Sequence, residues 1–182
     1  DRLIMENVPH MLLEGIAIAT HAIGAKECFI YIRGEYTVPI ARVRQAIAEA
    51  ERAGYLGTNV LGTGLTVRTL VVVGAGAYIC GEETGLLSSL EGKKGHPKLK
   101  PPFPAISGLY QCPTVVNNVE TLAYLPHIVT MGGEAFAALG SPKNGGVALY
   151  CVSGHVNRPQ VLELPMGTTL RSMIYDHCGG IR

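Results

Sequence analysis

Glycines and carboxylates gather in one short stretch of the sequence, residues 74–84, directly after the apolar run Leu70–Val73. Glycine lets a backbone approach a ligand closely and adopt positive φ angles without steric cost. An apolar strand, this turn and a helix-like segment from Thr84 to Leu90 follow one another, so the first N–H groups of the helix would point into the turn. Such an arrangement is typical of a nucleotide-binding site. Its candidate binding glycines are Gly74, Gly76 and Gly81.

The spacing and charge of this stretch narrow the choice of ligand. Gly-x-Gly-x-x-x-x-Gly is neither the Rossmann fingerprint nor a P-loop, since no Gly-Lys-Ser/Thr follows. The adjacent carboxylates of Glu82 and Glu83 would repel a phosphate placed in the turn, but they can accept hydrogen bonds from hydroxyls, ring N–H groups or an amide. A structural alternative for Glu83 is that its carboxylate only favours the dipole at a helix start.

A second polar stretch, Asn117–Thr121, also marks the start of a helix. Asn117 or Asn118 can cap this helix, and Glu120 stands three residues after Asn117, as in a capping box. The capping function is compatible with a ligand-binding function of the same side chains. Further along, Pro126 is predicted to end or kink the helix near Leu125.

The apolar periodicity before these stretches predicts alternating helices and strands. Because the connections are short enough for right-handed crossovers, we expect an α/β fold with a Rossmann-like open sheet, helices on both faces and ligands at the strand carboxyl ends. The expected elements are a helix over Val8–Ala25, a buried parallel strand over Cys28–Ile32, a helix over Val38–Arg52, a loop over Gly57–Gly64 and a strand over Leu65–Val73.

Two further segments complete the organisation. Gly92–Pro113 is rich in proline and lysine and is too long for an incidental connector, so its prolines would hold Lys100 and Phe103 in place; an ordinary surface loop is the alternative. After the linker-like residues 140–146, the pattern predicts a hairpin and a helix. The hairpin strands are expected over Val147–Val152 and Gln160–Leu164, and the helix over Thr168–Cys178.

Composition excludes several classes of function. A net charge of +1, with 16% charged residues, gives no basic patch for nucleic acid. The longest apolar run, Leu70–Cys80, is too short to span a membrane, and no signal peptide opens the chain. The cysteines are scattered without a Cys-x-x-Cys pair, which predicts reduced, buried thiols and no iron–sulfur site or other metal site within the chain. They are Cys28, Cys80, Cys112, Cys151 and Cys178.

Four motifs resemble one known family. The chain is similar to the FMN-binding flavin subunit of respiratory NADH:quinone oxidoreductase (complex I), a family that includes the diaphorase subunits of NAD-linked hydrogenases and formate dehydrogenases. The resemblance extends from Asp1 to Gly180. Since the chain begins without a methionine, we expect it to be the central fragment of a longer subunit. The motifs that carry the resemblance are Gly74–Thr84, Ser89–Gly92, Lys100–Pro104 and Val116–Thr121.

The resemblance implies a function for each candidate residue. Glu83 is implied as the catalytic residue, nearest to the place where nicotinamide meets flavin. Phe103 would stack on the adenine of NADH, and Lys100 would neutralise a dinucleotide phosphate. A helix N-terminus with amide and hydroxyl donors would hold the flavin phosphate. The implied FMN-binding residues are Gly74, Gly76, Tyr78, Gly81, Glu82 and Glu83 in the first segment, and Asn117, Asn118 and Thr121 in the second.

The resemblance also implies the reaction and the cofactors. Hydride would pass from NADH to FMN, and single electrons would then pass to iron–sulfur clusters and quinone, with partners that include an iron–sulfur subunit. The family's upstream glycine-rich loop, its acidic segment and the cysteines that bind a 4Fe–4S cluster have no counterpart in these residues, so we expect the isolated chain to be inactive. Two other functions stay open, namely a diaphorase of a soluble NAD-linked hydrogenase or formate dehydrogenase, and a non-catalytic docking module.

The resemblance divides the chain and places it in the cell. Residues 1–141 would form the α/β flavin- and NADH-binding domain, and residues 142–182 the first half of a β-grasp (ubiquitin-like) unit. The expected location is the peripheral arm on the cytoplasmic side of a bacterial inner membrane, or the cytoplasm, and the matrix in a mitochondrion. No direct insertion into the membrane is expected.

Overall fold

The computed structural model describes residues 1–182 and divides into two compact units, Asp1–Pro126 and His127–Arg182. The first unit contains a three-stranded sheet with helices, and the second contains a two-stranded hairpin with short helices. Helix α5 (Val119–Met131) continues through the boundary between them.

The sheet of the first unit has the strand order β1-β3-β2. Strands β1 (Glu27–Arg33) and β3 (Leu65–Gly74) are parallel, in a register that pairs Glu27 with Arg68 and Arg33 with Gly74. The two predicted strands are therefore confirmed. Their carboxyl ends lie together, so the glycine turn that follows β3 lies beside the residues that follow β1.

The third strand, β2 (Gly57–Val60), corrects the prediction of a loop over Gly57–Gly64. It pairs with β3 in the antiparallel direction, which makes the sheet mixed and not a purely parallel Rossmann-like sheet. Only Val60 is buried in this strand, so the sequence lacks the alternating apolar pattern of a half-buried strand. Backbone pairing at the edge of the sheet, and not side-chain burial, holds β2.

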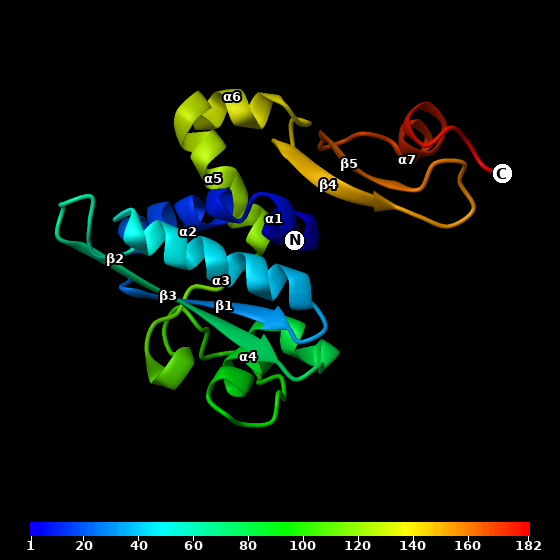
Figure 1. Ribbon diagram of the computed structural model, residues 1–182. Coiled ribbons are helices and arrows are strands. Elements are labelled where there is room, and N and C mark those ends of the chain that lie inside the picture. The colour runs from blue at the N-terminus through cyan, green and yellow to red at the C-terminus, as the bar shows by residue number, and fades with distance from the viewer. The chain divides into compact units, whose positions relative to one another are not determined.

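Helices cover both faces of this sheet (Figure 1). Helices α1 (Arg2–Asn7), α2 (Pro9–Ile23) and α3 (Thr37–Arg52) lie on one face, and α4 (Glu83–Leu90) lies on the other. The predicted helices are confirmed, although the sequence did not indicate α1. Large side chains with at most 2% of their surface exposed, Leu12, Ile16, Val43 and Val67, form the centre of the core.

The backbones of helices α5 and α2 are in close contact. A Cβ on Gly15 of α2 would lie 1.9 Å from the carbonyl oxygen of Leu122, so only glycine fits there. This carbonyl stands four residues before Pro126, which has no N–H to donate to it. Of the two predicted effects of Pro126, an end of the helix is wrong, because α5 continues to Met131. The Leu122 carbonyl lacks its helical N–H donor, but the helix continues beyond Pro126.

The second unit contains α6 (Gly133–Ala138), β4 (Val147–Val152), β5 (Gln160–Pro165) and α7 (Leu170–Ser172). Strands β4 and β5 are antiparallel, from Val147 opposite Pro165 to Val152 opposite Gln160, so the predicted hairpin is confirmed. The Thr169 hydroxyl accepts a hydrogen bond from the Ser172 N–H at 3.2 Å and caps α7. One π-helical turn, Met173–His177, continues α7. The observed helix therefore starts two residues later than predicted, and its second part is a π-helix.

The cysteines are all free thiols, but they differ in burial. Cys80 and Cys178 are buried, and burial raises the pKa of Cys28 to about 11. Cys112 and Cys151 are exposed, so the expectation of buried thiols is wrong for these two. Cys112 lies in an irregular segment, and Cys151 lies on a two-stranded hairpin that buries few of its side chains. Among the helices, none combines the length and apolarity that a membrane span requires.

Candidate functional site

The glycine turn begins where β3 ends, at Gly74, and passes through Gly76, whose φ is +89°. A 3-10 turn, Tyr78–Gly81, follows and leads into α4. The Tyr78 side chain is 98% exposed, and a Cβ on Gly81 would meet no atom within 4 Å. The turn therefore presents an open surface with one exposed aromatic ring.

Glu82 caps the helix that follows the turn. One oxygen of its carboxylate, Oε2, accepts hydrogen bonds from the N–H groups of Thr84 and Gly85, each at 2.9 Å, and from the Thr84 hydroxyl. The hydrogen bond from the Thr84 side chain is the largest cause that holds the pKa of Glu82 below its ordinary value, and the bond from Gly85 adds to it. This oxygen is bonded to its own helix, so only the other carboxylate oxygen, Oε1, faces Lys100, at 3.8 Å from Nζ.

The buried Thr84 connects the long loop to α4, a function that the sequence did not indicate. Its hydroxyl accepts a hydrogen bond from the Lys98 N–H at 2.7 Å while it donates to Glu82. The only local signal was a threonine placed directly after two glutamates, which is too common to indicate a loop anchor. Thr84 fixes the Lys98 backbone two residues before Lys100.

Lys100 and Glu83 form an ion pair between the two predicted parts of the site. Both side chains are about one-third exposed: 30% for Lys100 and 35% for Glu83. The hydrogen bond with Glu83 is the main cause that raises the pKa of Lys100. The structure therefore joins a residue predicted to contact FMN to a residue predicted to contact NADH, although they lie 17 positions apart.

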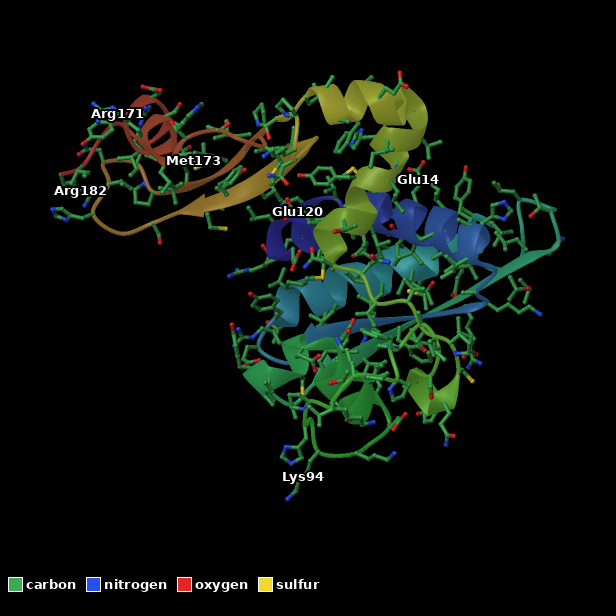
Figure 2. The ribbon with its side chains drawn as sticks, turned by 180° about the vertical axis from the view of Figure 1, so that it is seen from behind. Glu14, Lys94, Glu120, Arg171, Met173 and Arg182 are labelled. Carbon is green, nitrogen blue, oxygen red and sulfur yellow. The ribbon has the colours of Figure 1, made fainter.

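The remainder of the loop borders a pocket and carries Phe103 on its outside. The pocket has a volume of about 480 Å³ and is lined by both the loop and α4. Phe103 is 54% exposed and is not part of the pocket wall. Lys94, near the start of the loop, lies on its outer side and points away from the sheet (Figure 2). The pocket is lined by Thr84, Leu87, Lys98, Leu99 and Tyr110, among others.

Asn118, and not Asn117, caps helix α5. Its side-chain oxygen accepts the Glu120 N–H at 2.8 Å, and its side-chain nitrogen donates to the Asp1 carboxylate at 3.0 Å. With Asn118 as the cap, Glu120 stands at the second helical position, one short of a capping box, and it accepts a hydrogen bond from the Tyr124 hydroxyl. Asn117 and Thr121 are exposed.

The chain does not join its two predicted flavin segments. No hydrogen bond or ion pair connects Tyr78–Glu83 to Asn117, Asn118 or Thr121. Asn117 instead lines a groove of about 640 Å³ that follows the free edge of β1. No group of three or more His, Cys, Asp or Glu side chains is placed to hold a metal ion.

The cap at Glu82 predicts an acid-sensitive contribution to stability. Because its pKa is lowered from the ordinary 4.5 in the folded chain, its contribution is present above pH 4.5 and is lost as the pH falls through the lowered value. Glu82→Gln should therefore melt at a lower temperature than the unmodified chain at neutral pH, and the difference should shrink in acid. Thermal unfolding across pH 3–7 measures this. Glu14→Gln, at an exposed position of α2, is the control; an unchanged difference at every pH would contradict the prediction.

Comparison with known proteins identifies the family. Residues 1–127 match the family described as the Nuo51 FMN-binding domain, and residues 149–182 match the SLBB domain. A subunit of the NADH-quinone oxidoreductase of Rhizobium meliloti is 55% identical over 180 residues, which cover 99% of this chain and 43% of the relative. The corresponding relative in Aquifex aeolicus, also named as an NADH-quinone oxidoreductase subunit, is 54% identical and is covered to 42%. The chain thus spans less than half the length of these relatives.

The fold matches a solved enzyme as well. The crystal structure of an NAD+-reducing [NiFe]-hydrogenase in the H2-reduced state superposes with a TM-score of 0.86 and 39% identity, over 96% of this chain and 29% of that one. The air-oxidized state gives a TM-score of 0.85 and 38% identity. With the family match covering residues 1–127, more than half of its length, the chain belongs to the Nuo51 FMN-binding domain family.

Proposed function

We propose that this chain is the central part of an NADH dehydrogenase flavin subunit that transfers hydride from NADH to FMN and passes electrons on to iron–sulfur clusters and quinone. One observation carries the proposal. The Lys100–Glu83 ion pair brings the loop expected to bind the dinucleotide against the turn expected to bind the flavin. Relatives named as subunits of NADH-quinone oxidoreductase support the same reaction.

The residues of the turn fit a flat, polar ring system. Gly81 leaves open space above the backbone, and the exposed Tyr78 ring offers an apolar face beside it. When bound, FMN supplies the hydride-accepting and one-electron chemistry that no side chain here can supply. The chain contributes binding and charge: the residues that would hold the ring are Gly74, Gly76, Tyr78, Gly81 and Glu82. The N-terminus of α5, with Asn117, Asn118 and Thr121, would supply donors for a phosphate, and Asn118 would exchange its Asp1 partner for it.

The dinucleotide would lie on the loop side of the same turn. Phe103 offers a half-exposed ring for stacking on adenine, and Lys100 offers a cation for a phosphate. Lys100 must exchange its Glu83 partner for that phosphate. Glu83 would then face the nicotinamide as a carboxylate that orients the reacting ring and balances its positive charge after hydride transfer.

The other parts of the chain would connect it to a larger assembly. Residues 1–141 would form the flavin- and NADH-binding domain, and residues 142–182 the start of a β-grasp unit; the SLBB match over 149–182 supports the latter. The partners would include an iron–sulfur subunit, in a peripheral arm on the membrane surface. The structural match to an NAD+-reducing hydrogenase favours a second candidate, a diaphorase subunit of a soluble hydrogenase or formate dehydrogenase.

Expression of the complete reading frame that encodes this chain tests the proposal. We expect the purified protein to contain one FMN per polypeptide, released by heat and identified by its fluorescence, and to reduce ferricyanide with NADH. Co-purified subunits would distinguish a quinone-linked complex from a hydrogenase. A protein that contains no flavin after reconstitution with excess FMN, and that does not oxidise NADH, would contradict the proposal and favour a non-catalytic docking module.

A further inference from the structure

Tyr31, on β1, fills the space below the glycine turn. A Cβ on Gly74 would lie 2.8 Å from the Tyr31 Oη, 2.9 Å from its Cε1 and 3.0 Å from its Cζ. The φ of Gly74 is not positive, so this glycine is required by contact with the tyrosine and not by an unusual backbone angle. Gly34 is also close to Gly74, since a Cβ on Gly34 would lie 2.7 Å from the Gly74 carbonyl oxygen. Gly74, the first residue of the turn, is thus packed between Tyr31 and Gly34.

The same phenol also contacts helix α4. Tyr31 Oη lies 2.9 Å from Ser89 Oγ, in a hydrogen bond between residues 58 positions apart. Burial is the main cause that raises the pKa of Tyr31, and the neighbouring buried thiol of Cys80 raises it further. The phenol therefore stays protonated at neutral pH. Tyr31 touches the strand end, the turn and the helix at once.

We propose that Tyr31 is a positioning residue of the flavin site: through its contact with Gly74 and its hydrogen bond to Ser89, it sets where the turn and the start of α4 lie. This role rests on the function proposed above. Ser89 and Glu83 belong to the same helix, six residues and about 9 Å apart at 1.5 Å per residue. The hydrogen bond that fixes Ser89 therefore also restricts where Glu83 lies, because the helix backbone between them is rigid. The contact with Gly74 restricts Tyr78 in the same way, through the turn.

Three variants of the complete flavin subunit test this role: Tyr31→Phe, Ser89→Ala and the double variant. Tyr31→Phe removes the hydroxyl but keeps the ring, and Ser89→Ala removes the same hydrogen bond from the other side. Each should lower kcat for NADH oxidation about threefold to tenfold, since one net hydrogen bond corresponds to about that factor. The KM for NADH should stay unchanged, and the visible circular dichroism of bound FMN should change in the same way in both. The double variant should be no slower than either single one.

Tyr55→Phe is the matched control, because Tyr55 is exposed and its hydroxyl makes no hydrogen bond within the chain. It should keep the wild-type spectrum and kcat. Wild-type dichroism and kcat in Tyr31→Phe, or additive effects in the double variant, would overturn the positioning role while the proposed function stands. A wild-type protein that binds no FMN would instead contradict the proposed function, and the positioning role with it. If Tyr31→Phe fails to fold, Ser89→Ala alone decides, because it leaves the ring against Gly74.

Discussion

Glu83→Ala in the complete subunit is expected to slow NADH oxidation about a hundredfold while FMN content stays near the wild-type value. Removing one preorganised electrostatic group at a reacting centre costs about 10²–10³ in rate. Glu83 is the first residue of α4 and faces Lys100, whereas the neighbouring Glu82 caps the helix. The loss of Glu83 therefore removes charge from the site and leaves the helix capped.

Turnover and flavin content measured on the same preparation check this expectation. Glu14→Ala is the control, because Glu14 is an exposed glutamate of α2, on the face of the sheet opposite α4 (Figures 1 and 2). Unchanged turnover at full flavin loading would show that Glu83 only favours the dipole at the helix start. Loss of FMN together with activity would assign Glu83 to flavin binding and not to the reaction.

Phe103→Ala is expected to raise the KM for NADH about tenfold to a hundredfold with little change in kcat. Stacking of a base on an aromatic ring is worth about 1–3 kcal/mol, and a contact far from the reacting atoms acts equally on ground and transition states. The Phe103 ring is half-exposed, so its removal should leave the fold intact.

Steady-state kinetics with varied NADH measure the effect. Ile106→Ala is the control, because Ile106 is an exposed side chain of the same loop without a ring. A normal KM with a reduced kcat would contradict stacking and would indicate that Phe103 acts at the reacting centre. An equal rise of KM in the control would indicate a loop that has lost its structure.

The helices and strands with strong periodicity were predictable, and the elements held by backbone pairing were not. Strand β3 ends in the apolar run Leu70–Val73, and α3 places its buried residues at helical spacing, so both follow from the sequence. Strand β2 buries one side chain, and its pairing with β3 depends on a turn that the apolar pattern does not show. Pro126 did not end α5, because the loss of one helical hydrogen bond is small against the packing of the whole helix.

The candidate site was predictable as a set of residues but not as an arrangement. The motifs indicated Glu83 and Lys100, but nothing in their spacing indicated that they form an ion pair. Tyr31 gave no signal at all, since it lies in an apolar strand and its partner Ser89 lies 58 positions away. Contacts of this kind depend on the register of β1 with β3 and on the placement of α4. The functions of the individual site residues stay predictions until the variants are measured.

The distribution of the thiols gives each unit one chemically addressable position. Thiolates react and thiols do not, so the raised pKa of the half-buried Cys28 slows its reaction with alkylating reagents, and burial shields Cys80 and Cys178 from them. Cys112 in the first unit and Cys151 in the second are exposed. A maleimide dye pair would therefore attach once to each unit without any engineered cysteine. The native chain thus has two labelling sites, and energy transfer between dyes on them would report the distance between the units in solution.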